Sequence, residues 1–134
     1  MKRSVFVTGA AYGTGRAIAE RFAEDGYNVF ISGRRKEEVE ASAASLSEKY
    51  GVYARGFATT EFSQQEVKEI FLEIKNSGYS VDTIVLNAAN LGIGQNSLTV
   101  DIEEFMQVYD INVKWNFMMA REAALLMIER KRAR

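Results

Sequence analysis

The sequence predicts an α/β fold in which a doubly wound parallel sheet has helices on both faces. Short runs of β-branched and aromatic residues alternate four times with longer stretches whose apolar residues recur at helical spacing. Strands separated by helices in this way join through right-handed crossovers and lie parallel. No proline, linker or low-complexity stretch interrupts the 134 residues, so we expect one continuous domain.

The predicted strands and helices follow one another along the chain. The strand candidates are bounded by glycine, asparagine or charged residues and cover Ser4–Thr8, Asn28–Ser32, Val52–Ala58 and Thr83–Asn87. The helical stretches cover Gly15–Asp25, Lys36–Tyr50, Gln64–Asn76 and Asp101–Arg130. Glycines close the first three helices, and Ser63 is placed to cap the third. The last helix is expected to break near Asn112.

Composition excludes several classes of function. A net charge of −1 indicates neither nucleic-acid nor membrane-surface binding, and no apolar run approaches the ~20 residues that span a bilayer. The chain has no cysteine, which excludes disulfides and thiolate catalysis, and no histidine, the commonest general base and zinc ligand. We therefore expect a cytoplasmic protein without a metal site.

The first predicted strand runs into a glycine-rich turn that opens a helix. Gly9 allows the strand to turn sharply, Gly13 allows the backbone to approach a diphosphate, and Gly15 allows the helix to pack on the sheet. The helix N-terminus adds free N–H groups and the positive end of a dipole. Such turns lie at the carboxyl edge of a parallel sheet, so the pattern favours a dinucleotide site. A tight structural turn without a ligand is the alternative.

Three motifs resemble those of the short-chain dehydrogenase/reductase family. Thr8-Gly9-x-x-x-Gly13-x-Gly15 is similar to its cofactor motif, which is wider than the usual G-x-G-x-x-G. Leu86-Asn87-Ala88-Ala89 imperfectly matches Asn-Asn-Ala-Gly at the end of the fourth strand, and Asn112-Val113 matches an Asn-Val pair in the fourth helix. The motifs occur in the family's order, so the chain is identified as a member, represented by its N-terminal, cofactor-binding portion.

The resemblance implies a Rossmann-like half-sheet with strand order 3-2-1-4, in a single dinucleotide-binding domain over 1–134 that stops before the family's fifth strand. Family members transfer a hydride between a nicotinamide and a carbonyl or alcohol carbon of a small molecule. Asn112 matches the Asn that anchors a water in the proton relay; a purely structural role in a helix bend is the alternative. The family's Tyr, Lys and Ser are expected beyond Arg134, because no Tyr-x-x-x-Lys occurs here. This chain alone is therefore expected to be catalytically incomplete.

The residues after the second strand favour NADP(H) over NAD(H). Enzymes that prefer NAD place a carboxylate there to accept hydrogen bonds from the ribose hydroxyls, whereas this chain has Gly33, followed by Arg34 and Arg35. Two guanidiniums without a carboxylate favour a 2′-phosphate. We expect Arg34 to bind that phosphate and Ser32 to donate a hydrogen bond to it. The alternative for Arg35 and the lysine after it is a solvated first turn of the next helix.

Further cofactor contacts follow from the family pattern. The resemblance places Thr8, Tyr12 and Thr14 in the cofactor motif, where Tyr12 either shields the phosphates or fills the loop. Thr60 stands where the family has an Asp that contacts the adenine amino group. Asn87 and Ala88 are expected beside the cofactor ribose, the alternative for Asn87 being that it only ties off the strand end.

The last predicted helix is rich in apolar side chains, among them Met118, Met119, Leu125, Leu126 and Met127. The fourth strand lies at an unpaired edge of the predicted sheet, and naked edges recruit other chains. Enzymes of the resembling family pair this helix with its copy, so we expect a homo-oligomer through the last helix. A non-catalytic nucleotide-binding or dimerisation module, and a remnant that merely folds, are the alternative functions.

Overall fold

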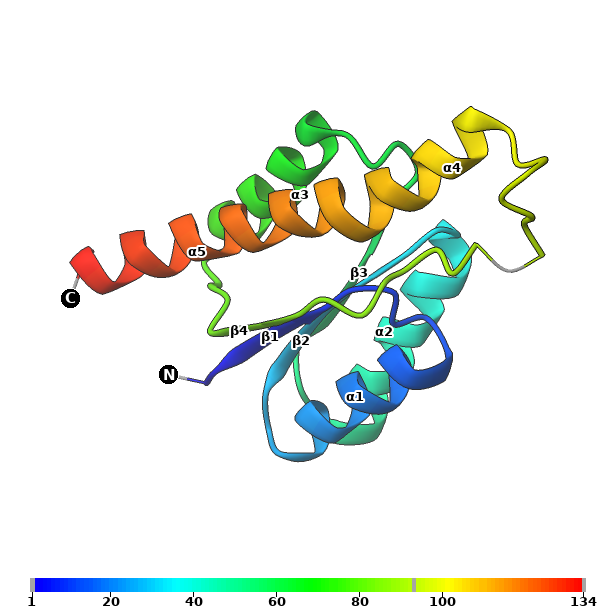
Figure 1. Cartoon of the computed structure of the whole chain (residues 1–134). Helices are drawn as coiled ribbons and strands as arrows, with labels where there is room; N and C mark the ends of the chain where they lie inside the picture. Colours follow the sequence, from blue (N-terminus) through cyan, green and yellow to red (C-terminus); the bar gives the residue numbers. More distant parts are fainter. Residues whose placement is uncertain (1, 93, 134) are drawn as a thin grey trace.

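The computed structural model describes residues 2–92 and 94–133. Its centre is a four-stranded parallel sheet in the order β3-β2-β1-β4. The strands are β1 (Ser4–Val7), β2 (Asn28–Gly33), β3 (Ala54–Ala58) and β4 (Thr83–Val85). This arrangement confirms the predicted doubly wound, Rossmann-like fold and its strand order, and it places the reversal of winding between β1 and β4 (Figure 1).

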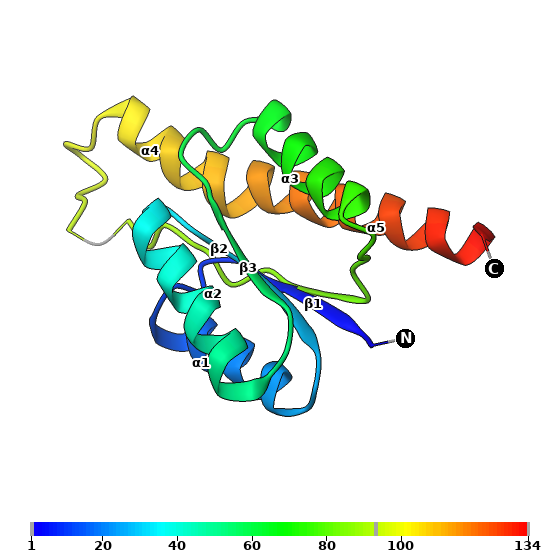
Figure 2. The ribbon, with the colours of Figure 1, turned by 180° about the vertical axis from the view of Figure 1, so that it is seen from behind.

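Helices cover both faces of the sheet (Figures 1 and 2). One face carries α1 (Gly13–Glu24) and α2 (Lys36–Tyr50), and the other carries α3 (Gln64–Asn76) and a long composite helix. The composite helix consists of α4 (Ile102–Tyr109), the π-helical turn η1 (Asp110–Trp115) and α5 (Asn116–Ala133). Within the described ranges, no helix has both the length and the apolar character that a bilayer crossing requires.

Alternate residues of β1 enter two separate apolar cores. Phe6 belongs to the core beneath α3 and α5, where its ring stacks on those of Phe30 and Phe57 at centroid distances of 6.4 and 6.0 Å. Val5 and Val7 enter the core beneath α1 and α2. All of these β1 side chains are fully buried, as expected for a central parallel strand that is covered on both faces.

The structure shifts some predicted boundaries by about two residues. Helix α1 begins at Gly13 rather than Gly15, and β3 begins at Ala54. Strand β4 ends at Val85, because the N–H of Asn87 turns back to the Thr8 side-chain oxygen instead of continuing the ladder. A break was predicted near Asn112, but the helix continues there and only changes to the π-helical turn η1.

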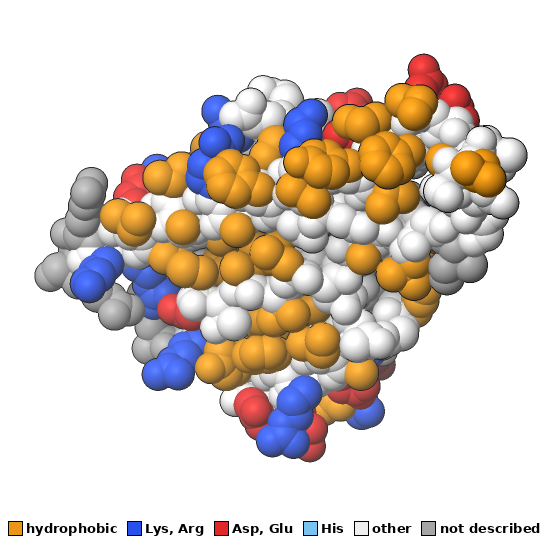
Figure 3. All heavy atoms as spheres, in the orientation of Figure 1, with side chains coloured by type: hydrophobic (Ala, Val, Ile, Leu, Met, Phe, Trp, Pro, Cys, Tyr) orange, Lys and Arg blue, Asp and Glu red, His pale blue; other side chains and the backbone are white. Residues whose placement is uncertain are grey.

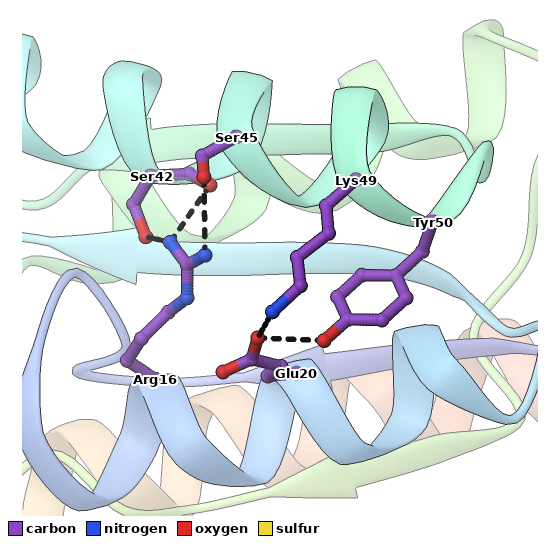
Figure 4. Close-up of polar contacts among 6 residues, drawn as sticks. All are labelled: Arg16, Glu20, Ser42, Ser45, Lys49 and Tyr50. Carbon is purple, nitrogen blue, oxygen red and sulfur yellow. Dashed lines mark hydrogen bonds and ion pairs between the residues drawn. The ribbon is translucent and has the colours of Figure 1, made fainter.

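A polar cluster joins α1 to α2 (Figure 4). Glu20 accepts hydrogen bonds from the Lys49 ammonium at 2.8 Å and from the Tyr50 hydroxyl at 2.6 Å. The bond from Lys49, followed by that from Tyr50, lowers the pKa of the Glu20 carboxyl below its ordinary value of 4.5. The bond to Glu20 raises the pKa of Lys49 from 10.5 to about 12. Near the start of α1, Arg16 donates to the backbone oxygen of Ser42 at 3.0 Å, so α2 is held against α1 along its length.

Candidate functional site

A groove of about 920 Å³ lies at the carboxyl ends of the strands. Its walls are formed by the turn after β1, the end of β2 with the start of α2, the segments that follow β3 and β4, and one residue of η1. The lining residues are Gly9, Ala11, Tyr12, Gly13, Thr14, Gly15, Ser32, Gly33, Arg34, Arg35, Glu38, Thr59, Phe62, Asn87, Ala88, Ala89, Asn90, Leu91 and Ile111. Its size and its position beside the reversal of winding are those of a nucleotide or cofactor site in an open α/β sheet.

The turn between β1 and α1 presents bare backbone to this groove. Gly9 and Gly13 have φ of +62° and +67°, in the left-handed region that favours glycine. A Cβ at Gly13 would meet no atom within 4 Å, whereas one at Gly15 would overlap the Gly9 carbonyl oxygen. Gly13 thus leaves the groove open, and Gly15 lets the start of α1 lie directly against the turn. Because N–H groups at a helix start lack partners within the helix, the turn has the shape and polarity that a diphosphate requires.

Thr8 and Asn87 tie this turn to the segment after β4. The buried Thr8 hydroxyl accepts hydrogen bonds from the N–H groups of Asn87 and Ala88, each at 3.0 Å. The Asn87 side-chain amide donates to the Gly9 carbonyl oxygen at 3.1 Å. Asn87 and Ala88 line the groove, but Thr8 does not. Thr8 lies behind the wall and positions it, because its hydroxyl already binds two backbone amides.

The end of β2 leaves little space for a side chain at position 33. A Cβ on the buried Gly33 would lie 3.2 Å from the Cβ atoms of Ala11 and Val39, closer than ordinary van der Waals contact. A side chain at this position would therefore require Ala11 and Val39 to shift by a few tenths of an ångström. The residue that follows, Arg34, is exposed and lines the groove.

The polar residues around Gly33 differ in their partners. Arg35 forms an ion pair with Glu38 at 3.2 Å. Across the described ranges Arg34 has no carboxylate partner, and its guanidinium carbon lies 5.6 Å from the ring centroid of Phe62. Ser32 lines the groove but is almost fully buried, and its hydroxyl oxygen accepts a hydrogen bond from the Gly9 N–H at 3.2 Å. Ser32 therefore holds the glycine turn in place from β2.

After β3 the structure presents Thr59 rather than Thr60 to the groove. The exposed Thr60 turns away, because its N–H and hydroxyl both donate to the Glu66 carboxylate, at 3.0 and 3.4 Å. Phe62 also lines the groove and was missed by sequence reasoning. The Ser63-x-x-Glu66 spacing is the signal that could have located this turn, since Ser63 Oγ accepts from the Glu66 N–H at 3.1 Å and so caps the helix that follows.

Tyr12 and Thr14 lie at the mouth of the groove. Both are exposed, Tyr12 by 76%, so the Tyr12 ring does not fill the loop. Asn112 is not among the lining residues, although its neighbour Ile111 is. The Asn112 side chain is instead hydrogen-bonded to the backbone of Asn90, which does line the groove.

These observations define a class: an α/β protein with a glycine-rich turn where the winding of a parallel sheet reverses. A family model for short chain dehydrogenases matches residues 3–134. The chain therefore belongs to the short-chain dehydrogenase family, whose members are NAD(P)-dependent oxidoreductases.

Individual relatives give the same assignment. The 3-oxoacyl-(acyl-carrier-protein) reductase FabG of Aquifex aeolicus is 32% identical over 127 residues, which cover 93% of this chain and 50% of the relative. A 3β-hydroxysteroid dehydrogenase of Mediterraneibacter gnavus is 33% identical over 128 residues, covering 94% and 45%. L-sorbose reductase from Gluconobacter frateurii, solved with NADPH and L-sorbose, superposes with a TM-score of 0.89 at 26% identity, covering 96% and 49%. The chain spans about half the length of the curated relatives it matches.

Proposed function

We propose that this chain is the NADP(H)-binding half of an oxidoreductase that transfers a hydride between the nicotinamide and a carbonyl or alcohol carbon of a small molecule. The observation that carries the proposal is the open turn at Gly13, which places bare backbone at the start of α1 in the wall of the groove. Anions bind where backbone N–H groups and a helix N-terminus converge in this way. Residues 1–134 are then a single dinucleotide-binding domain.

The residues at the end of β2 support NADP(H) rather than NAD(H). Gly33 offers no carboxylate for the ribose hydroxyls, and its packing against Ala11 and Val39 opposes one. Arg34 offers a guanidinium for a 2′-phosphate, a pairing that gains from charge-assisted, two-pronged hydrogen bonds. The similar L-sorbose reductase was solved with NADPH, which agrees with this preference.

Within the complete enzyme, bound NADPH supplies the hydride, and this chain's residues hold and orient the cofactor. The glycine turn would bind the diphosphate, and Asn87 and Ala88 would contact the ribose. Asn112 would serve the proton relay from η1 by holding the loop at Asn90, because its side-chain amide is already bonded to the Asn90 backbone. The sequence holds no Tyr-x-x-x-Lys, the family's spacing for the lysine that helps the tyrosine donate a proton near neutral pH.

The test is a calorimetric titration of Gly13→Asp with NADPH, matched by Gly26→Asp. The two glycines share a positive φ, +67° and +88°, and at both a new Cβ would meet no atom within 4 Å. The strain of substitution is therefore matched, but only Gly13 lies in the groove. We expect Gly13→Asp to weaken NADPH binding by about tenfold or more through repulsion of the diphosphate, and Gly26→Asp to leave it unchanged. Equal losses, or no binding by the wild type, would contradict the proposal.

A second candidate function, dimerisation, is favoured by the exposed face of the composite helix. Phe105, Tyr109, Val113 and Phe117 are each exposed by half or more and recur at intervals of four residues. Figure 3 shows hydrophobic side chains gathered along this helix and over the sheet edge at β4. An apolar stripe of this kind marks an association surface, and we propose that a second copy of the chain covers it.

Light scattering coupled to size exclusion tests this second function. Phe117→Asp is expected to reduce the measured mass from that of a dimer to that of one chain, because a charge in an apolar interface is not compensated. The control is Leu98→Asp, since Leu98 is 91% exposed in the loop before α4. A wild type with the mass of one chain at tens of micromolar would contradict dimerisation without affecting the cofactor proposal.

A further inference from the structure

Phe62 has an unusual backbone conformation for a large side chain. Within residues 2–92 and 94–133 it is the one non-glycine residue with a positive φ, at +52°. In this region the Cβ of an L-residue approaches the neighbouring carbonyl, at a cost of roughly 1–2 kcal/mol. Such residues persist where the surrounding structure holds them, and they gather at binding sites. Phe62 fits this description, because it lines the groove.

The carboxylate of Glu66 holds the strained turn. It accepts hydrogen bonds from three successive backbone N–H groups, those of Thr60 at 3.0 Å, Glu61 at 3.2 Å and Phe62 at 3.1 Å. Glu66 is itself placed by the Ser63 cap at the start of α3. A bond between a carboxylate and a backbone N–H is stronger than a neutral one. These bonds compensate the strain and fix the direction of the Phe62 side chain.

The Phe62 ring lies between the apolar core and the groove, and it contacts one residue on each side. One contact is with the fully buried Trp115, at a centroid distance of 5.3 Å and an interplanar angle of 76°, an edge-to-face arrangement. The other is with Arg34, whose guanidinium carbon lies 5.6 Å from the ring centroid, within the range of a cation–π interaction. The ring therefore connects a rigid core residue to an exposed cation at the rim.

Arg34 would otherwise have little to hold it. The next residue, Arg35, is bound by Glu38 at 3.2 Å, whereas Arg34 has no carboxylate partner within the part of the chain that the structure describes. An exposed arginine side chain loses about 2 kcal/mol of rotamer entropy when it is immobilised. Contact with an aromatic ring already restricts the rotamers of the guanidinium side chain, so less conformational entropy is lost when an anion binds.

We propose that Phe62 is a positioning residue that presents the Arg34 guanidinium to the 2′-phosphate of the cofactor and so sets the preference for NADPH over NADH. This inference rests on the proposed NADP(H) binding. It assigns the preference to two segments, the end of β2 and the strained turn before α3, rather than to Arg34 alone. The ring acts through Arg34, so its removal affects the phosphorylated cofactor selectively.

The experiment measures dissociation constants for NADPH and NADH in wild type, Phe62→Leu and Phe62→Tyr, and in Phe62→Leu combined with Arg34→Met. Leucine keeps an apolar contact with Trp115 but has no aromatic face, whereas tyrosine keeps the face. We expect Phe62→Leu to raise the dissociation constant for NADPH by about two- to fivefold, the size of an exposed cation–π contact. The dissociation constant for NADH is expected to stay unchanged. Phe62→Tyr is expected to retain the wild-type ratio of the two constants. Phe62→Leu is expected to change nothing further once Arg34 is methionine.

Each alternative result is informative. If Phe62→Leu leaves the ratio of the two dissociation constants unchanged, or weakens the binding of both cofactors equally, the inference is overturned. The proposed function is not affected by either result. Failure of the wild type to bind either dinucleotide overturns the proposed function and the inference with it. If Phe62→Leu does not fold, Phe62→Met, which fills a similar volume without a ring, provides the same comparison.

Discussion

Asn112 and Asn90 exchange two hydrogen bonds across 22 positions of sequence. Asn112 Oδ1 accepts from the Asn90 N–H, and Asn112 Nδ2 donates to the Asn90 carbonyl oxygen, both at 2.8 Å. One side-chain amide therefore satisfies both backbone groups of a residue that lies outside any helix or strand. The pair joins the loop after β4 to the π-helical turn η1, and both partners stand next to residues that line the groove, Leu91 and Ile111.

Asn112→Ala is expected to destabilise the chain even without cofactor. The substitution leaves two backbone groups of the half-buried Asn90 without a partner, at a cost of about 1–3 kcal/mol in the free energy of unfolding. Urea denaturation measures this cost. Asn96→Ala serves as control, because the Asn96 side chain accepts a single hydrogen bond, from the Leu98 N–H, in an exposed loop. An unchanged midpoint for Asn112→Ala would show that Asn112 does not hold the bend.

Arg34→Asp is expected to weaken the binding of NADPH far more than the binding of NADH. Loss of a charge-assisted bond, with a repulsive carboxylate in its place, changes affinity by roughly tenfold to a hundredfold. NADH lacks the 2′-phosphate and should bind about equally well to both proteins. Arg35→Asp is the matched control, since Arg35 is already paired with Glu38. Equal losses of both cofactors in Arg34→Asp would show that the phosphate is read elsewhere.

Gly33→Asp, which introduces the carboxylate of NAD-preferring enzymes, is not expected to create an NADH site. The new side chain would crowd Ala11 and Val39, each 3.2 Å from the added Cβ, in a buried position. Overpacking of this kind costs about 1–3 kcal/mol. Urea denaturation and NADH titration measure the two effects, and Ala11→Gly in the same chain should recover part of the stability. Tighter NADH binding without loss of stability would contradict this account.

Stability should depend on Glu20 only while Glu20 is ionised. Its pKa is lower in the folded chain than the ordinary 4.5, so its contribution is present above pH 4.5 and is lost as the pH falls through the lowered value. Urea midpoints for wild type and Glu20→Gln should therefore differ near neutral pH and converge in acid. The pKa of Lys49 is raised from 10.5 to about 12. Its contribution to stability is therefore present below pH 10.5 and is lost as the pH rises through about 12. Glu24→Gln, at an exposed position of the same helix, should follow the wild type throughout.

Much of the site could be predicted from the sequence because its signals are local. The turn from Gly9 to Gly15 combines a β-branched run, spaced glycines and a helical pattern within 15 residues, and backbone conformation there follows from the glycines themselves. Arg34 was proposed from its position after the second predicted strand, whereas Asn87 came from the family resemblance at the end of the fourth. The order 3-2-1-4 came from the family resemblance, and the strand pairing confirms it.

The residues that sequence reasoning misplaced depend on partners far along the chain. Thr60 leaves the groove for the Glu66 carboxylate, and Thr8 lies behind the wall because it binds amides about 80 residues away. Phe62 was missed because nothing in its own sequence predicts a positive φ. That conformation exists because Glu66, Trp115 and the packing of α3 hold it.

By itself, then, the sequence determined the alternation of strands and helices, the glycine turn and the absence of a carboxylate at the end of β2. These are properties of residue type and spacing, which act within a few residues. The tertiary structure alone decided which side chains face the groove and which support it. That distinction depends on hydrogen bonds and ring contacts between segments that become neighbours only when the sheet assembles.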